Sequence, residues 1–396
     1  MRGAVSIATT PPATIAGANP DPGVRRRLDA VDLLRGIVMI MMALDHVRDH
    51  FSNAAVDPTD LAHTTPALFL TRWVTHFCAP TFVLLAGASA YLAGRRGRTR
   101  RELSRFLLTR GIWLVVLEAT VVRVGWSFDP HFGWPALQVI WAIGASMIVL
   151  SGLVFLPTPA IAAFGITLIA GHNLVDGIAP ERFGAAAWVW SVLHVPRFPV
   201  VYPLVPWVGV MAVGYGLGPL LLREATERRR ILVRLGLGLT VAFLILRLAN
   251  GYGDPAPWST QPRAGFTILS FLDTTKYPPS LLFLLMTLGP AIAALPALER
   301  LSGPAARVIL VYGRVPLFYY VLHLYLIHAL AVLAAYLAGR DIAAFMTACF
   351  AFPKDWGFGL PVVYVTWILV VALLYAPCRW FGGVKQRRRD PWLSYL

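Results

Sequence analysis

Apolar blocks of about twenty residues recur along the whole chain, and they constrain its fold more than any other feature. A helix needs roughly 20 predominantly apolar residues to cross the hydrocarbon layer of a bilayer. Only 14% of the 396 residues are charged, whereas soluble domains are typically about 25% charged. Such a chain cannot cover a core of its size with polar surface, so we predict an all-α, polytopic integral membrane protein. The blocks predict helices near residues 31–51, 66–93, 104–125, 134–156, 158–175, 201–222, 231–250, 279–298, 308–337 and 360–381.

Short clusters of basic residues separate the apolar blocks and predict the orientation of the chain. They lie at residues 25–27, 95–101, 223–230 and 387–389. Lys and Arg accumulate in the cytoplasmic loops of membrane proteins, and an even number of spans places every cluster on one side. We therefore expect about ten transmembrane helices with both termini cytoplasmic. The net charge of +15 would suggest nucleic-acid binding in a soluble protein, but topology accounts for these clusters, so no nucleic-acid partner is expected.

The two ends of the chain differ in composition from its apolar middle. Residues 1–27 are rich in Pro, Ala and Gly and lack the apolar run of a secretory signal, which predicts a disordered cytoplasmic tail. Residues 28–384 are expected to form one transmembrane domain in contact with the lipid bilayer. Residues 385–396 are expected to form a basic cytoplasmic C-terminal tail.

The first predicted helix carries a polar stripe along one face. At 100° per residue, Arg35 and His46 point in nearly the same direction, and Asp32 and Asp49 lie beside them. Each charge inside a span costs about 2.5–3.5 kcal/mol on the insertion scale, so such residues are functional candidates. One interpretation is an ion pair of Asp32 with Arg35 for helix packing, with the remaining polar groups reaching the outer interface. The other interpretation places His46 in a wet cavity, where Asp49 fixes its tautomer and raises its basicity.

The second predicted helix places Arg72 and His76 one turn apart on one face. Pro80 lacks the N–H that would bind the backbone near His76, so a kink is expected there. We favour a functional role for this face over a purely structural histidine. Glu118 on the third predicted helix is expected to serve as a structural charge, the counter-ion of Arg72. Further candidate binding residues lie near the outer ends and in the ninth predicted span: Lys276, Tyr277, Arg314 and His323.

Metal binding is suggested only weakly by the sequence. His46, Asp49 and His50 stand at i, i+3 and i+4 of a helix, a spacing that can bind a metal ion. The three cysteines, at positions 78, 349 and 378, lie in or beside apolar segments without metal-like spacing. We therefore expect no metal site and no permanently bound cofactor.

Several motifs resemble one known family. The start Asp32-x-x-Arg35-Gly36, with His46 at the far end of the same helix, resembles the opening of integral-membrane acyltransferases. More of the chain is similar to the bacterial branch of the heparan-alpha-glucosaminide N-acetyltransferase catalytic-domain family. The similar segments are Leu44-Asp45-His46-x-Arg48-Asp49, residues 60–66, Thr71-Arg72-Trp73-x-Thr75-His76-Phe77-Cys78-Ala79-Pro80, and residues 202–209, 276–280 and 313–320. The resemblance covers nearly the whole chain after residue 27.

The resemblance implies an enzyme of ten or eleven spans in the bacterial inner (plasma) membrane. It would transfer an acyl group, most simply acetyl, from a cytoplasmic acyl-CoA such as acetyl-CoA to an extracytoplasmic sugar or glycan acceptor. Asp32 and Arg35 match the signature, and His46 takes the histidine position of the wider acyltransferase group. The animal branch has an amide at the His46 position and its catalytic histidine shortly before the second span, where His63 is the nearest residue in this sequence.

The expected chemistry uses His46, supported by Asp49, as general base on an acceptor hydroxyl or amine. His63 and His76 are the alternative bases. Arg72 or His76 would stabilise the thioester oxyanion in a site of low dielectric constant. The phosphates of the donor would be held by Arg35, Arg95, Arg96 and Arg314.

A membrane protein of another class would use buried charges differently. A transporter or flippase for a polar lipid or small solute would use them as gates or proton relays. Transporters usually contain internal repeats with matched broken helices, and the sequence shows no such repeat. The sequence leaves open whether the protein is a homodimer.

Overall fold

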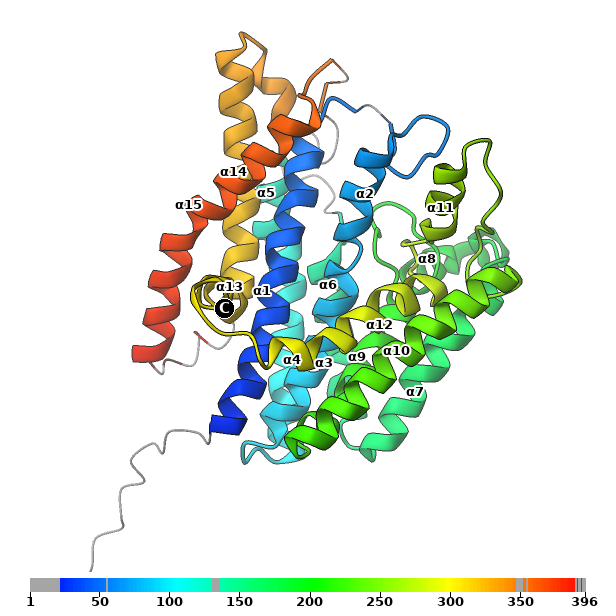
Figure 1. Cartoon of the computed structure of the whole chain (residues 1–396), viewed down its shortest axis with the longest axis vertical. Helices are drawn as coiled ribbons and strands as arrows, with labels where there is room; N and C mark the ends of the chain where they lie inside the picture. The colour runs from blue at the N-terminus through cyan, green and yellow to red at the C-terminus, as the bar shows by residue number, and fades with distance from the viewer. Residues whose placement is uncertain are drawn as a thin grey trace, which may run out of the picture.

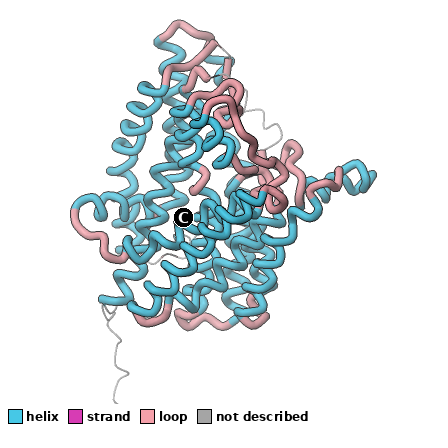
Figure 2. The backbone as a smooth tube through the Cα atoms, turned by 45° about the vertical axis from the view of Figure 1, so that its right-hand side comes forward, coloured by secondary structure: helices cyan, strands magenta, loops and turns pink. Residues whose placement is uncertain are grey.

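The computed structural model describes residues 22–54, 56–129, 136–346, 352–353, 355–388, 390 and 393, with side chains from Asp29 onward. The described residues form helices and connections, with only isolated β-bridges and no β-sheet. The predicted all-α fold is therefore confirmed. Figure 2 shows that the loops gather at opposite ends of the bundle.

Long helices alternate with short helical segments along the chain. From the N-terminus they are α1 (Pro22–Phe51), α2 (Pro66–Thr75), α3 (Cys78–Gly94), α4 (Arg100–Leu117), the π-helix η1 (Glu118–Val122), α5 (Arg123–Ser127), α6 (Val139–Leu153), α7 (Thr158–Gly171), the 3₁₀ helices η2 (His172–Val175) and η3 (Pro180–Ala186), α8 (Ala187–Leu193), α9 (Leu204–Leu221), α10 (Ala225–Ala249), α11 (Ala264–Leu272), α12 (Leu281–Leu298), α13 (Pro304–Arg314), α14 (Pro316–Leu337), the 3₁₀ helix η4 (Ile342–Phe345) and α15 (Leu360–Arg387).

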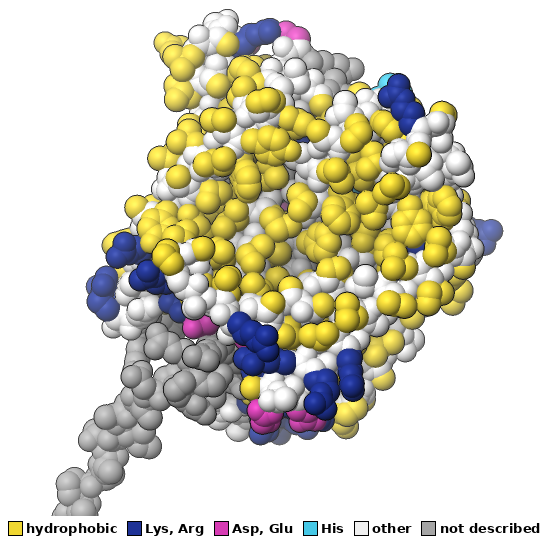
Figure 3. Space-filling view, viewed as in Figure 1, with side chains coloured by type: hydrophobic (Ala, Val, Ile, Leu, Met, Phe, Trp, Pro, Cys, Tyr) yellow, Lys and Arg dark blue, Asp and Glu magenta, His cyan; other side chains and the backbone are white. Residues whose placement is uncertain are grey.

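The two ends of the bundle differ in the length of their connections (Figure 1). The basic face carries the short connections at residues 95–99, 222–224 and 299–303. The loop face, at the opposite end, carries the longer connections at residues 52–65 and 250–263. Figure 3 shows hydrophobic side chains over most of the visible surface, with most Lys and Arg side chains gathered toward the basic face. This distribution is typical of a protein with an apolar belt in the bilayer.

Seven helical segments in the described residues are long and apolar enough to cross a membrane. They are residues Pro66–Gly94, Thr158–Val175, Leu204–Leu221, Ala225–Ala249, Leu281–Leu298, Pro316–Leu337 and Leu360–Arg387. Helix α6 is apolar but shorter, whereas α1 and α4 contain several charged residues. Helix α4 packs on α6, α6 packs on α9, and α1 packs on α3, α14 and α15, so these three helices belong to the same bundle as the seven. The protein is thus a polytopic helical membrane protein, and the exact count of ten spans stays a prediction.

Two prolines divide helices that the apolar pattern runs together. Helix α2 ends at Thr75 and α3 begins at Cys78, because Pro80 has no N–H to donate to the carbonyl of His76. The kink predicted from Pro80 is therefore present. The single helix predicted for residues 308–337 was wrong, since the structure has α13 and α14 with a break at Val315. Pro316 restricts the backbone of the residue before it and begins the new helix.

Close contact between α1 and α13 depends on glycine. A Cβ atom on Gly313 would lie 1.8 Å from the carbonyl oxygen of Asp32, and one on Gly36 would lie 2.3 Å from that of Ile309. Small residues permit this approach between membrane helices. The contact brings Arg35 of α1 beside the C-terminal end of α13.

The ends of the chain are more helical than predicted where they are described. Helix α1 begins at Pro22, before the predicted end of the tail at residue 27, and α15 continues to Arg387, past residue 384. Residues 1–21, most of the last eight residues, and Cys349 lie outside the described residues. The predicted tails and domain boundaries therefore stay predictions.

A buried carboxylate clamps α10 to the end of α12 on the basic face. Glu299 accepts hydrogen bonds from the Nε atoms of Arg228 and Arg229, both at 2.7 Å, and its side chain is 3% exposed. Burial would raise the pKa of Glu299, but the hydrogen bonds from the two guanidinium groups outweigh burial and lower it. The folded state therefore favours the ionised carboxylate.

Replacing Glu299 by glutamine is expected to lower the melting temperature in detergent. The loss should correspond to about 3 kcal/mol, the lower end of the cost of leaving buried charges without a partner. Because the pKa is lowered on folding, the stability of the wild type over the variant should be full above pH 4.5, the usual value for Glu, and should disappear as the pH falls further. Glu227→Gln is the control, since Glu227 pairs with Arg223 on the surface at about half exposure. Equal losses in both variants would contradict the clamp.

Candidate functional site

Two buried histidines from α1 and α14 contact each other inside the bundle. The Nδ1 atom of His46 lies 2.6 Å from the Nε2 atom of His323, and the two rings are stacked with centroids 4.8 Å apart. His46 is 9% exposed and His323 is fully buried. Trp126 of α5 covers the His46 ring edge-on, at a centroid distance of 4.7 Å. We call His46 and His323 the histidine pair.

The hydrogen bonds of the histidine pair define its tautomers. The Nδ1 atom of His323 donates to the Tyr319 carbonyl at 3.1 Å, so Nε2 of the neutral ring carries the lone pair. His46 must then donate from Nδ1 to that nitrogen. The Nε2 atom of neutral His46 is left with a lone pair, which is the state that a general base requires. His50 donates to the His46 carbonyl at 2.8 Å and so also fixes this turn of α1.

The partner expected for His46 was wrong. Asp49 does not contact the His46 ring but forms an ion pair with Arg48 at 2.5 Å. Residues 46 and 49 lie on neighbouring faces of α1, but the Asp49 carboxylate pairs with the adjacent Arg48 side chain instead. His323, which the sequence suggested as a binding residue, orients the ring instead.

Asp45 is the centre of a buried charge cluster beside the histidine pair. Its carboxylate accepts from Arg72 at 2.5 Å and from Thr75 at 2.9 Å, and pairs with Arg48 at 2.7 Å. The side chains of Asp45 and Arg72 are 12% and 15% exposed. The positive charge of Lys276, from the loop before α12, acts on Asp45 as well as on His46. The cluster thereby joins α1 to α2 next to His46.

The predicted pair of Glu118 with Arg72 was therefore wrong. Arg72 is paired with Asp45 of α1, which lies against α2. Glu118 lies at the π-helix η1 and accepts a hydrogen bond from the backbone N–H of Trp141 at 2.9 Å. It thus caps the N-terminal turn of α6, where free N–H groups favour a carboxylate.

The predicted ion pair between Asp32 and Arg35 is present. Arg35 donates to Asp32 at 2.7 Å, to Ser89 of α3 at 3.0 Å and to the Gly313 carbonyl at 3.3 Å. Arg314 donates to Asp29 at 2.9 Å. Both arginines are thereby held at the junction of α1, α3 and α13.

A cavity of about 340 Å³ extends into the bundle from these arginines. We call it the basic-face cavity. Four cationic side chains from different helices line it: Arg35, Arg110, Arg314 and Lys385. The remainder of its wall is almost entirely apolar, with side chains from α3, α4, α6 and α14. Its volume is within the 300–1,000 Å³ usual for small-molecule sites.

The basic-face cavity ends beside the histidine pair. The last lining residue on α1 is Met42, and His46 follows one turn later. The last lining residue on α14 is Tyr320, and His323 follows at the next turn. The rings of Tyr320 and His323 are 5.4 Å apart. Two helices therefore present a histidine at the same depth, just beyond the inner end of the cavity.

A smaller cavity lies on the other side of the histidine pair, toward the loop face. It has a volume of about 150 Å³. Its lining residues are Arg48, Asp49, Ser52, Ala54, Val56, Pro58 and Leu68. Along α1, His46 thus lies between Met42 of one cavity and Arg48 of the other.

The other predicted site residues are distributed unevenly. His76 is buried near the charge cluster, and its Nδ1 has no hydrogen-bond partner in the part of the chain described. The Lys276 ammonium group lies 5.2 Å from the Tyr277 ring centroid. Arg95 and Arg96, expected to bind a donor, are exposed and do not line the cavity. Arg110 and Lys385 line the cavity instead. The sequence pattern did not predict either residue as a donor-binding group.

His63 differs from the buried histidines of the site. It is exposed and donates to Asp60 at 2.7 Å, and this hydrogen bond is the main cause of the lowered pKa of Asp60. His328 of α14 is fully buried. It lies 3.1 Å from the Gly125 carbonyl and 2.7 Å from the Phe345 carbonyl, so it joins α14 to the segments beside it.

A known protein family matches more than half of the chain. The model of one family, described as heparan-alpha-glucosaminide N-acetyltransferase, catalytic, matches residues 27–246. The match includes His46, the charge cluster residues Asp45 and Arg72, and the parts of the cavity wall that come from α1, α3, α4 and α6. No curated protein matches the chain.

Proposed function

The chain belongs to the heparan-alpha-glucosaminide N-acetyltransferase catalytic family of membrane enzymes, and on that premise we propose that it acetylates a sugar from acetyl-CoA. The donor binds in the basic-face cavity. The acceptor, a sugar or glycan amine or hydroxyl, reaches His46 from the loop face. The observation that carries the proposal is the apolar cavity with cations at one end and the histidine pair just beyond the other.

The wall of the basic-face cavity suits acetyl-CoA in each part. The phosphates of CoA are multiply charged, and guanidinium groups bind phosphate through paired hydrogen bonds. Arg110, Arg314 and Lys385 would hold them, with Arg35 placed deeper by Asp32 and Ser89. The apolar part of the cavity would enclose the pantetheine arm and direct the thioester toward Met42 and Tyr320.

In the proposed reaction, His46 acts as the general base. The acceptor amine or hydroxyl attacks the thioester carbonyl carbon while Nε2 of His46 takes its proton. The tetrahedral intermediate then collapses, the C–S bond breaks, and the CoA thiolate leaves with the proton returned from His46 or from solvent. The hydrogen bond from Nδ1 of His46 to His323 keeps the ring oriented and spreads the charge that develops.

The oxyanion of the intermediate needs a donor that is not already engaged. Arg72 is already paired with Asp45, so we assign this role to His76. Lys276 supplies a positive charge near both His46 and His76. Donors in a water-poor site stabilise an oxyanion most strongly. Asp49 and Tyr277 are assigned to the acceptor side, where Asp49 lines the loop-face cavity.

The proposed orientation follows from the donor. Acetyl-CoA is cytoplasmic, so the basic face lies in the cytoplasm, in agreement with the Lys and Arg distribution. The protein then spans the cell (inner) membrane ten times through one domain, residues 28–384, with both termini in the cytoplasm.

Binding of CoA should depend on the cations of the cavity. For the full-length protein in detergent, Arg110→Ala and Lys385→Ala are each expected to weaken CoA binding about 10–100-fold, the value of a lost hydrogen bond to a charged group. Arg105→Ala is the matched control, because Arg105 is exposed on the same helix and does not line the cavity. Dephospho-CoA tests which cation meets the 3′-phosphate, since one of the two variants should no longer discriminate against it.

Turnover is measured as release of CoA thiol from acetyl-CoA, with glucosamine and its methyl glycoside as test acceptors. The proposal expects release that depends on an amino-sugar or sugar acceptor. CoA binding that is unchanged in both cavity variants, or that weakens equally in Arg105→Ala, would contradict the donor site.

A further inference from the structure

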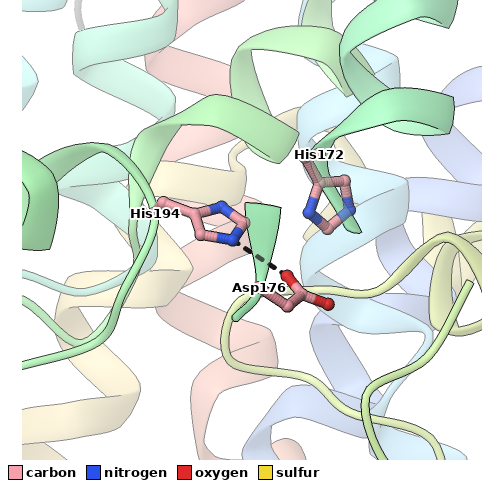
Figure 4. Close-up of side chains that lie close together, drawn as sticks. All are labelled: His172, Asp176 and His194. Atoms are coloured by element: carbon pink, nitrogen blue, oxygen red, sulfur yellow. Dashed lines mark hydrogen bonds and ion pairs between the residues drawn. The ribbon is translucent and has the colours of Figure 1, made fainter. Parts of the chain in front are cut away.

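Three side chains of types that can bind a metal ion, His172, Asp176 and His194, lie close together (Figure 4). His172 begins η2, Asp176 follows directly after η2, and His194 follows α8. One ligand atom from each residue lies within 4.8 Å of the others. None of the three lines either cavity described above.

The two histidines are buried without satisfying their polar atoms. His172 is 4% exposed and His194 is 1% exposed. Neither ring nitrogen of His172 has a hydrogen-bond partner among the described residues, nor has Nδ1 of His194. The Pro279 carbonyl lies close to the His172 ring, but without the geometry of a hydrogen bond. Buried polar groups are nearly always paired, so three unpaired imidazole nitrogens at one place indicate a missing ligand.

The carboxylate of this cluster is held in position by its neighbours. Asp176 accepts from Nε2 of His194 at 2.9 Å and from the Asn173 amide at 2.8 Å. The Asn173 side-chain oxygen in turn accepts from the backbone N–H of Leu281, at the start of α12. A ligating carboxylate fixed by such hydrogen bonds is a regular feature of metal sites.

We propose that His172, Asp176 and His194 bind a divalent transition-metal ion, for which Zn²⁺ is the best match. Two imidazoles and one carboxylate are a common zinc ligand set, with bonds of about 2.0–2.2 Å and a further position for water. Small rotations of the three side chains bring their ligand atoms from 4.8 Å to the closer spacing of a tetrahedral site. The ion replaces the hydrogen bond between His194 and Asp176, and the displaced imidazole proton moves to the other ring nitrogen or to solvent.

The ion would fasten the loop face at a point where three segments meet. It would connect the end of α7 to α8, and through Asn173 to the start of α12. The loop that precedes α12 carries Lys276, so the metal would order the wall on the acceptor side. This role does not require the metal to take part in acyl transfer, and it departs from the expectation from sequence that no metal site exists.

Metal uptake by the full-length protein in detergent tests the site. After treatment with a chelator, the wild type should take up one Zn²⁺ per chain, and Co²⁺ as probe should give the visible absorption of a tetrahedral ion. Zn²⁺ should also raise the melting temperature, as any ligand of the folded state does. His172→Ala and His194→Ala should each lose the Co²⁺ absorption and the Zn²⁺-dependent shift. Asn173→Ala should weaken binding about 10–100-fold.

His63→Ala is the control, because His63 lies in a loop of the same face and pairs only with Asp60 among the described residues. It should behave as the wild type. If a histidine variant does not fold, Asp176→Asn, of nearly the same shape, takes its place. A wild type that takes up no more Zn²⁺ than the His172→Ala, His194→Ala double variant, with no melting shift, would overturn the proposal and leave buried water as the missing ligand.

Discussion

Replacing His46 by alanine is expected to lower acetyl transfer by about 10²–10⁴-fold, the usual contribution of a general base. His46 is the histidine at the inner end of the basic-face cavity, and its Nε2 carries a lone pair in the neutral histidine pair. It does not line the cavity itself. CoA binding should therefore change little, whereas the melting temperature should fall by the equivalent of about 1–3 kcal/mol, because buried His323 loses its hydrogen-bond partner. Turnover and CoA affinity are measured on the same preparation.

Variants of His323 and His63 distinguish the general base from a residue that positions it and from a histidine outside the site. His323→Gln should lower the rate less than His46→Ala and should shift the pH–rate profile, because it changes the partner that orients the His46 ring. His63→Ala should leave turnover unchanged, since His63 is exposed and paired with Asp60. Near-normal turnover in His46→Ala, with an inactive His63→Ala or His76→Ala, would move the base to one of those residues.

Replacing Asp45 by asparagine should give the largest loss of stability. Two arginines, Arg48 and Arg72, would lose their shared carboxylate in a buried place. Removing one partner of a buried ion pair costs about 3–5 kcal/mol, so a large drop in melting temperature is expected. Adding Arg72→Gln should recover part of the loss, because it removes one of the uncompensated charges.

The comparison of two double variants makes this test specific. Residues in one charge network show non-additive effects, whereas separate residues add. Asp45→Asn with Arg72→Gln should be clearly less destabilised than the sum of the single variants. Glu118→Gln with Arg72→Gln should be additive, because Glu118 caps α6 instead. The reverse result would return Arg72 to the pair first expected from sequence.

The helices could be predicted from sequence because each apolar block carries its own signal. The polar stripe on α1 was equally local, since Arg35 and His46 share a face by helical periodicity alone. The ion pair of Asp32 with Arg35 lies within one turn of one helix, and periodicity therefore found it. The break at Pro80 likewise follows from a single residue.

Partners on different helices could not be predicted, because periodicity gives the face of a helix but not what it packs against. Asp45 faces α2 and takes Arg72 only after α1 and α2 are docked. His323 meets His46 across 277 positions of sequence. Arg110 inside α4 and Lys385 in the last turn of α15 resemble ordinary basic residues in sequence, and only the folded bundle brings them to one cavity. His172 and His194 lie in a connection without a metal-binding pattern, so nothing in the sequence marked them.

A cryo-electron microscopy map of the full-length protein with a thioether analogue of acetyl-CoA would test the link between cavity and histidine pair directly. The phosphates are expected beside Arg110, Arg314 and Lys385 on the basic face. The acyl end is expected past Met42, within reach of Nε2 of His46. Nucleotide density outside the basic-face cavity, or an acyl group directed away from His46, would contradict the proposed donor site and the proposed base together.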